Sequence, residues 1–134
     1  MMAADFDQLA LYLHLARASE LRRRPLVRDR LLVIAGSLAA EIGLGRIAAL
    51  CREKVLRHNA GHMLRRLDSF EMANNDADFL KLLKQLFRRF PAEKAEQMLQ
   101  SLGVDRSGER DAYFSDEEYA ASIWGLTIEQ LHEE

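Results

Sequence analysis

Apolar residues recur along almost the whole chain at the spacing of three to four residues that marks one face of an α-helix. Strict alternation of apolar and polar residues, which would indicate a half-buried β-strand, is not sustained anywhere, and Leu and Ala outnumber the β-branched residues. The pattern therefore predicts an all-α fold. We expect a compact bundle of about six or seven helices that forms a single domain over residues 1–134.

Turn and capping residues set the expected helix limits. Pro25 disfavours helical geometry at the residue before it and itself suits a first helical position. Gly43 and Gly103 suit the left-handed residue that follows many helices. Ser115 and Thr127 each begin the sequence pattern of a capping box. The expected helices cover residues 5–22, 26–42, 44–59, 69–74, 77–90, 91–102 and 115–124, followed by a short turn from residue 127.

The second and third expected helices should form a close-packed hairpin over about residues 26–59, because small residues such as Gly36 and Ala39 allow a neighbouring helix to approach. Each expected helix places its large apolar residues in a row on one face. We expect these rows to meet in one contiguous core, formed by Leu31, Ile34, Leu38, Ile47, Cys51, Val55, Leu83, Leu86, Phe87, Met98, Leu99 and Leu102.

Composition narrows the class of protein. Apolar residues make up 49% of the chain and charged residues 30%, which excludes a disordered or collagen-like chain. The single cysteine, Cys51, excludes an internal disulfide. The acidic start does not resemble a signal peptide, and the longest uncharged run, residues 31–40, is too short for a membrane-spanning helix. We therefore expect a soluble, cytoplasmic protein with no membrane partner.

Charge is divided unevenly along the chain. Residues 1–67 carry a net charge of +6 and residues 68–134 a net charge of −8, of which the C-terminal segment, residues 105–134, supplies −7. A helix of about eight residues is not stable alone in water, so the aromatic residues of this segment must pack on the core or dock on another chain. We predict that the segment lies across the basic N-terminal helices of its own or a neighbouring molecule. The aromatic residues that would hold it are Tyr113, Phe114, Tyr119 and Trp124.

Arginine is the strongest functional signal in the sequence. The chain has 15 Arg and only 4 Lys, and five of the arginines surround the predicted turn between the first two helices. Guanidinium groups bind phosphate and carboxylate in a bidentate manner, so this cluster could bind nucleic acid, an acidic partner or the acidic segments of the protein itself. The alternative is a solvated surface with no ligand. The five residues are Arg22, Arg23, Arg24, Arg28 and Arg30.

Cys51, His58 and His62 could share one helical face, and the two histidines have the i, i+4 spacing of a helical metal pair. A thiolate with two imidazoles would suit zinc, cobalt or copper. Residues 59–61, however, predict a helix end between the histidines, and Cys51 lies in an apolar row. We therefore expect a core cysteine, no tight metal site and no cofactor, with metal binding as a remote alternative.

Sequence motifs of catalysis are absent. No phosphate-binding loop, dinucleotide fingerprint or nucleophile elbow occurs, and no set of residues suggests a catalytic centre. We expect a non-enzymatic helical interaction module that binds a protein partner or associates with itself. A nucleic-acid-binding or regulatory domain that uses the arginine cluster is the alternative, although aromatic residues do not alternate with the arginines.

Overall fold

The computed structural model describes residues 4–104, 106 and 108–133. It confirms the all-α prediction, because these residues form eight α-helices and two short 3₁₀ helices and no strand. No helix in the described ranges is long and apolar enough to cross a membrane. The elements are α1 (Phe6–Leu21), α2 (Pro25–Glu41), α3 (Gly45–His58), η1 (Met63–Arg66), α4 (Phe70–Ala73), α5 (Ala77–Arg89), α6 (Ala92–Ser101), η2 (Glu109–Ala112), α7 (Asp116–Ile123) and α8 (Ile128–His132).

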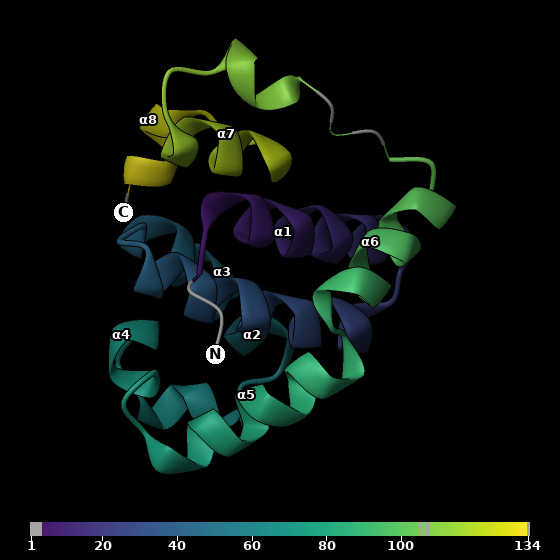
Figure 1. Ribbon diagram of the computed structural model, residues 1–134. Coiled ribbons are helices and arrows are strands. Elements are labelled where there is room, and N and C mark those ends of the chain that lie inside the picture. The colour runs from purple at the N-terminus through teal and green to yellow at the C-terminus, as the bar shows by residue number, and fades with distance from the viewer. Residues whose placement is uncertain (1–3, 105, 107, 134) are drawn as a thin grey trace.

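Helix α2 lies at the centre of the bundle (Figure 1). Helices α1 and α3 pack along it, and α4 and α5 cover it from another side. Helix α6 packs on α1, and α7 also packs on α1 from the side away from α2. Helix α8 contacts α3 and α7. The last two helices therefore close the bundle over its N-terminal half.

The centre of α2 is covered on every side. Residues 31–39 are buried without interruption. Gly36 is essential to this arrangement, since a β-carbon added there would overlap the ring of Phe70 on α4. The one polar side chain in the middle of the run, Ser37, donates a hydrogen bond to the Asn74 side chain at 2.7 Å. The expected close-packed hairpin of α2 and α3 is thus present, and α2 also packs against α1, α4 and α5.

Eight of the twelve expected core residues are buried. The prediction is wrong for Leu83 and Phe87 on α5 and for Met98 and Leu102 at the end of α6, which are half-buried at the edge of the core. The physical reason is that α5 and α6 are outer helices, so only a narrow strip of each is covered. That strip consists of Phe79 and Leu86 on α5 and Ala95 and Leu99 on α6.

Helix limits agree with the capping chemistry to within one or two residues. The Val104 amide donates to the Leu99 carbonyl at 3.3 Å, and Gly103 has φ +74°, which is the expected end of α6. The capping box at Thr127 is complete. At Ser115 it is not, because the Glu118 carboxylate accepts from the Phe114 amide instead of the Ser115 amide.

Two features of the helices differ from the prediction. Pro91 precedes α6 as its N-cap and is not its first residue, and the two 3₁₀ helices were not expected.

The contact between α2 and α4 gives a direct test of the core. We expect Gly36→Ala to lower the free energy of unfolding by about 1–3 kcal/mol, because the new methyl group must displace the Phe70 ring. Helix propensity alone predicts the opposite sign, since Ala is the better helix former by about 1 kcal/mol.

Gly45→Ala is the matched control, because a β-carbon at the start of α3 meets nothing within 4 Å. We expect this variant to be unchanged or more stable by up to about 1 kcal/mol. Urea unfolding followed by circular dichroism measures both variants. A Gly36→Ala variant as stable as the wild type would contradict the packing described here.

Candidate functional site

The turn between α1 and α2 is exposed along its whole length. Residues 22–24 form it, and they are exposed together with Leu21, the last residue of α1, and residues 25 and 26, the first two of α2. Leu21 and Leu26, at its two ends, are 69% and 65% exposed, which is unusual for large apolar side chains. Between them lie three consecutive arginines and Pro25, the first residue of α2. We call residues 21–26 the cationic corner.

Backbone geometry in the cationic corner is set by Arg23. Its φ of +59° lies in the left-handed region, and it is the one non-glycine residue with positive φ among those the structure describes. The Arg24 amide donates to the Ser19 carbonyl at 2.9 Å, so α1 ends in the manner that normally places glycine at this position. A side chain here carries a steric penalty of about 1–2 kcal/mol. The sequence thus places an arginine where glycine would be more stable.

A groove of about 240 Å³ lies beside the cationic corner. Arg22 and Arg24 line it together with two serines and four apolar residues. The apolar lining residues include Met98 of α6 and Leu102, the residue that follows α6, and both are half-buried. The remaining lining residues are Leu15, Ser19, Val27 and Ser101.

Arg28 is separated from the exposed arginines by its ion pairs. Its guanidinium donates to Glu20 of α1 at 2.9 Å and to Asp29 at 2.9 and 3.1 Å, and its side chain is 13% exposed. Asp29, which is buried, also bonds to His58 of α3 at 2.5 Å. Arg17 completes the chain of charges by donating to Glu20 at 2.8 Å. These ion pairs link three helices.

The five predicted anion-binding arginines therefore fall into different groups. Arg22, Arg23 and Arg24 are exposed and form no ion pair with any residue that the structure describes. Arg28 differs from these three, because its guanidinium pairs with the carboxylates of Glu20 and Asp29 in the same molecule. Arg30 is half-buried. The cationic corner thus retains three arginines that can meet an external anion.

The three candidate metal ligands are not brought together. Cys51 is in the core, where burial raises the pKa of its thiol to about 12. His58 is bonded to Asp29, and the Nδ1 atom of His62 accepts the Leu64 amide at 3.1 Å to cap η1. Within the described ranges, no group of three or more His, Cys, Asp and Glu residues could hold a metal ion.

Tyr119 is held in a polar contact between α7, η2 and α1. Its hydroxyl donates to Glu109 at 3.0 Å and contacts His14 Nε2 at 2.8 Å. With the hydroxyl proton on the Glu109 side, the complementary tautomer of His14 is the one that donates from Nε2. Burial, together with the Glu109 carboxylate, raises the pKa of Tyr119 to about 12. Burial lowers the pKa of His14, although Glu109 acts in the opposite direction on that group. Tyr113, which is half-buried, packs its ring 5.3 Å from that of Tyr119.

Trp124 packs between two cations of the N-terminal half. The Lys54 Nζ atom lies 4.5 Å from the ring centroid, and the Arg17 guanidinium lies 5.4 Å from it. Tyr119 and Trp124 thus contact the basic helices of the same molecule, while Phe114 is 99% exposed and takes no part in this packing.

Few of the acidic side chains of the C-terminal segment are involved in this contact. Among the described residues, Glu109 alone of them approaches an ionisable side chain of α1, at 3.8 Å from His14.

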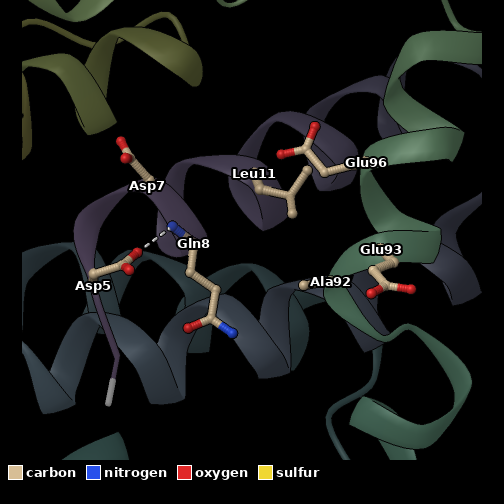
Figure 2. Close-up of a pocket in the computed structure, with 7 residues that line it drawn as sticks. All are labelled: Asp5, Asp7, Gln8, Leu11, Ala92, Glu93 and Glu96. Atoms are coloured by element: carbon tan, nitrogen blue, oxygen red, sulfur yellow. Dashed lines mark hydrogen bonds between the residues drawn. The ribbon is translucent and has the colours of Figure 1, made fainter. Parts of the chain in front are cut away.

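A second groove, of about 310 Å³, lies between the start of α1 and the start of α6 (Figure 2). Its apolar lining residues are Ala92, which is half-buried, and Leu11, which is buried. The Asp5 carboxylate accepts the Gln8 amide at 2.8 Å, and Glu96 pairs with Arg106 at 2.5 Å. We call this the acidic groove, because its charged lining consists of Asp5, Asp7, Glu93 and Glu96.

Comparison of the chain with protein-family models, curated proteins and solved structures finds no match.

The burial of His14 predicts an acid-sensitive fold. Above pH 6.5, its ordinary pKa, the imidazole is neutral in both the folded and the unfolded chain. As the pH falls through 6.5, the unfolded chain takes up a proton that the folded chain resists, so the free energy of unfolding falls. His62, whose pKa burial also lowers, contributes in the same direction.

We expect His14→Gln to lose less stability than the wild type between pH 7.5 and pH 5.5, with a residual fall due to His62. Urea unfolding at the two pH values measures the difference. An equal loss in both proteins would show that the His14 contact is not maintained in solution.

Proposed function

We propose that this protein is a non-enzymatic helical interaction module that binds a protein partner through the cationic corner and its adjoining groove. The observation that carries the proposal is the corner itself, in which three arginines without described ion-pair partners stand between two exposed leucines. Exposed apolar side chains that adjoin a groove and a charged rim are typical of protein-binding sites. The partner that fits is an acidic amphipathic segment.

The groove defines how such a segment would bind. Met98 and Leu102 supply an apolar floor that can accept the apolar face of a helix or an extended strand. Methionine adapts to irregular partners because its side chain is unbranched and polarisable. Arg22 and Arg24 at the rim can pair with carboxylates in bidentate geometry. Apolar contact then supplies most of the affinity, and charge selects and orients the partner.

Arg23 supports a role for the corner in binding. Its left-handed backbone is a conformation that side chains adopt at a steric penalty, and such positions concentrate at functional sites. A turn selected for stability alone would place glycine there.

Nucleic acid is the alternative partner, and the apolar residues argue against it. Phosphate binding uses Arg and Lys but gains nothing from two exposed leucines and an apolar floor. Bases could stack on an aromatic side chain, but no aromatic residue lies in the corner or lines its groove. A DNA duplex titrated in parallel with an acidic peptide makes the alternative an outcome of the same experiment.

We expect Arg22→Gln/Arg24→Gln to weaken binding of an acidic amphipathic peptide by at least about tenfold, or ~1.4 kcal/mol. The probe is a fluorescein-labelled helical peptide of about 15 residues with Leu along one face and Glu along the other. Fluorescence anisotropy at physiological salt measures its affinity. A labelled DNA duplex of similar charge is titrated in parallel.

Arg65→Gln/Arg66→Gln is the matched control, since it removes the same charge from two other exposed arginines. We expect it to leave peptide affinity within about twofold of the wild type. An equal loss in both variants would show that the peptide responds only to net charge. Tighter binding of DNA than of peptide, abolished by the corner variant, would favour the nucleic-acid alternative.

A further inference from the structure

We infer that the occupant of the cationic corner is a second copy of this chain, which presents its acidic groove to the corner in a head-to-tail contact. The inference rests on the proposed function and names its partner. Figure 2 shows the residues that line the groove of this second copy, with Glu93 and Glu96 of α6 near Leu11 and Ala92 and with Asp5 and Asp7 at the start of α1. The charge of this groove lining is opposite in sign to that of the corner.

The two surfaces are complementary in detail. The corner offers two protruding leucines with three arginines between them. The acidic groove has a volume of about 310 Å³ and a partly apolar lining that can accept an aliphatic side chain. Asp7 and Glu93 are exposed and form no ion pair with any residue that the structure describes. Two carboxylates therefore remain available to guanidinium groups.

The corner cannot reach the acidic groove of its own molecule. Both surfaces are attached to α1, whose 16 residues extend over ~24 Å at 1.5 Å per residue. Asp5 and Asp7 lie at the beginning of this rigid helix, and Leu21 ends it. The contact can therefore form only between two molecules.

The contact would join two different surfaces, so it is heterologous. A pair as a whole retains one free corner, on one molecule, and one free acidic groove, on the other, and association continues until a ring closes or a chain ends. Exposed ion pairs are individually weak and are screened by salt, so the leucines must supply much of the affinity. We therefore expect association that increases with protein concentration and decreases with salt.

Two variants, each of which retains one of the two surfaces, test the inference. Arg22→Gln/Arg24→Gln alters the corner and keeps the acidic groove, while Asp7→Asn/Glu93→Gln alters the acidic groove and keeps the corner. All four side chains are outside the core, and circular dichroism confirms that each variant is folded. Sedimentation velocity measures association of the wild type, of each variant and of their equimolar mixture.

We expect the wild type to form species larger than dimers, and each variant alone to associate at least about tenfold more weakly. In the mixture, the intact corner of one variant meets the intact acidic groove of the other, so we expect dimers that grow no further. A mixture that stays monomeric under conditions where the wild type associates would overturn the inference. A wild type that stays monomeric up to about 1 mM would also overturn it.

The outcome separates this inference from the proposed function. If the wild type is monomeric but the corner variant loses affinity for the acidic peptide, the corner binds a different protein and the proposed function stands. If the corner variant binds the peptide as the wild type does, the proposed function itself fails.

Discussion

The burial of α2 is the constraint on which the rest of the structure depends. Residues 31–39 are covered on all sides, so this helix can carry charged side chains only near its ends. Near its beginning, Asp29 is buried and requires partners, which are Arg28 on the same helix and His58 on α3. Breaking such a buried pair is strongly destabilising. Because the buried carboxylate of Asp29 requires partners, Arg28 is held away from solvent, and the first three helices are linked.

The same constraint leaves the turn before α2 without a role in the core. Helices α1 and α2 pack along their lengths, so the chain must reverse direction within a few residues, and Arg23 adopts the left-handed conformation to do so. The side chains of the turn are exposed, and those of Arg22 and Arg24 line the groove beside it. Leu21 and Leu26 remain exposed because no other element of the described structure covers them. This is the physical origin of the cationic corner.

Much of the fold could be predicted from the sequence, because capping residues and helical spacing act locally. The end of α6 at Gly103 is an example, since its left-handed turn depends on residues next to it in the chain. The burial of Phe87 and Met98 could not be predicted equally well, because helical spacing shows which face is apolar but not how many neighbours will cover it. The prediction therefore assigned too many core residues to the outer helices.

The candidate site was predictable only in part. The arginine cluster was visible, but the sequence did not show that Glu20 and Asp29 would occupy Arg28 and leave Arg22 and Arg24 exposed. The sequence did not indicate that the leucines at both ends of the turn would be exposed, because apolar residues next to helix ends are usually covered. The acidic groove was missed because its carboxylates lie at residues 5–7 and 93–96 and meet only when α6 packs on α1.

The central claim is that the cationic corner is maintained for binding at the expense of stability, and replacing Arg23 tests it most directly. Arg23→Gly relieves the left-handed strain and removes the guanidinium, while Arg23→Ala removes the guanidinium and keeps the strain. We predict that the free energy of unfolding of the glycine variant is about 1 kcal/mol higher than that of the alanine variant. We also predict that both variants bind the acidic amphipathic peptide more weakly than the wild type, and to a similar degree. Wild-type peptide affinity in both variants would contradict the claim, because Arg23 would then strain the turn without contributing to binding.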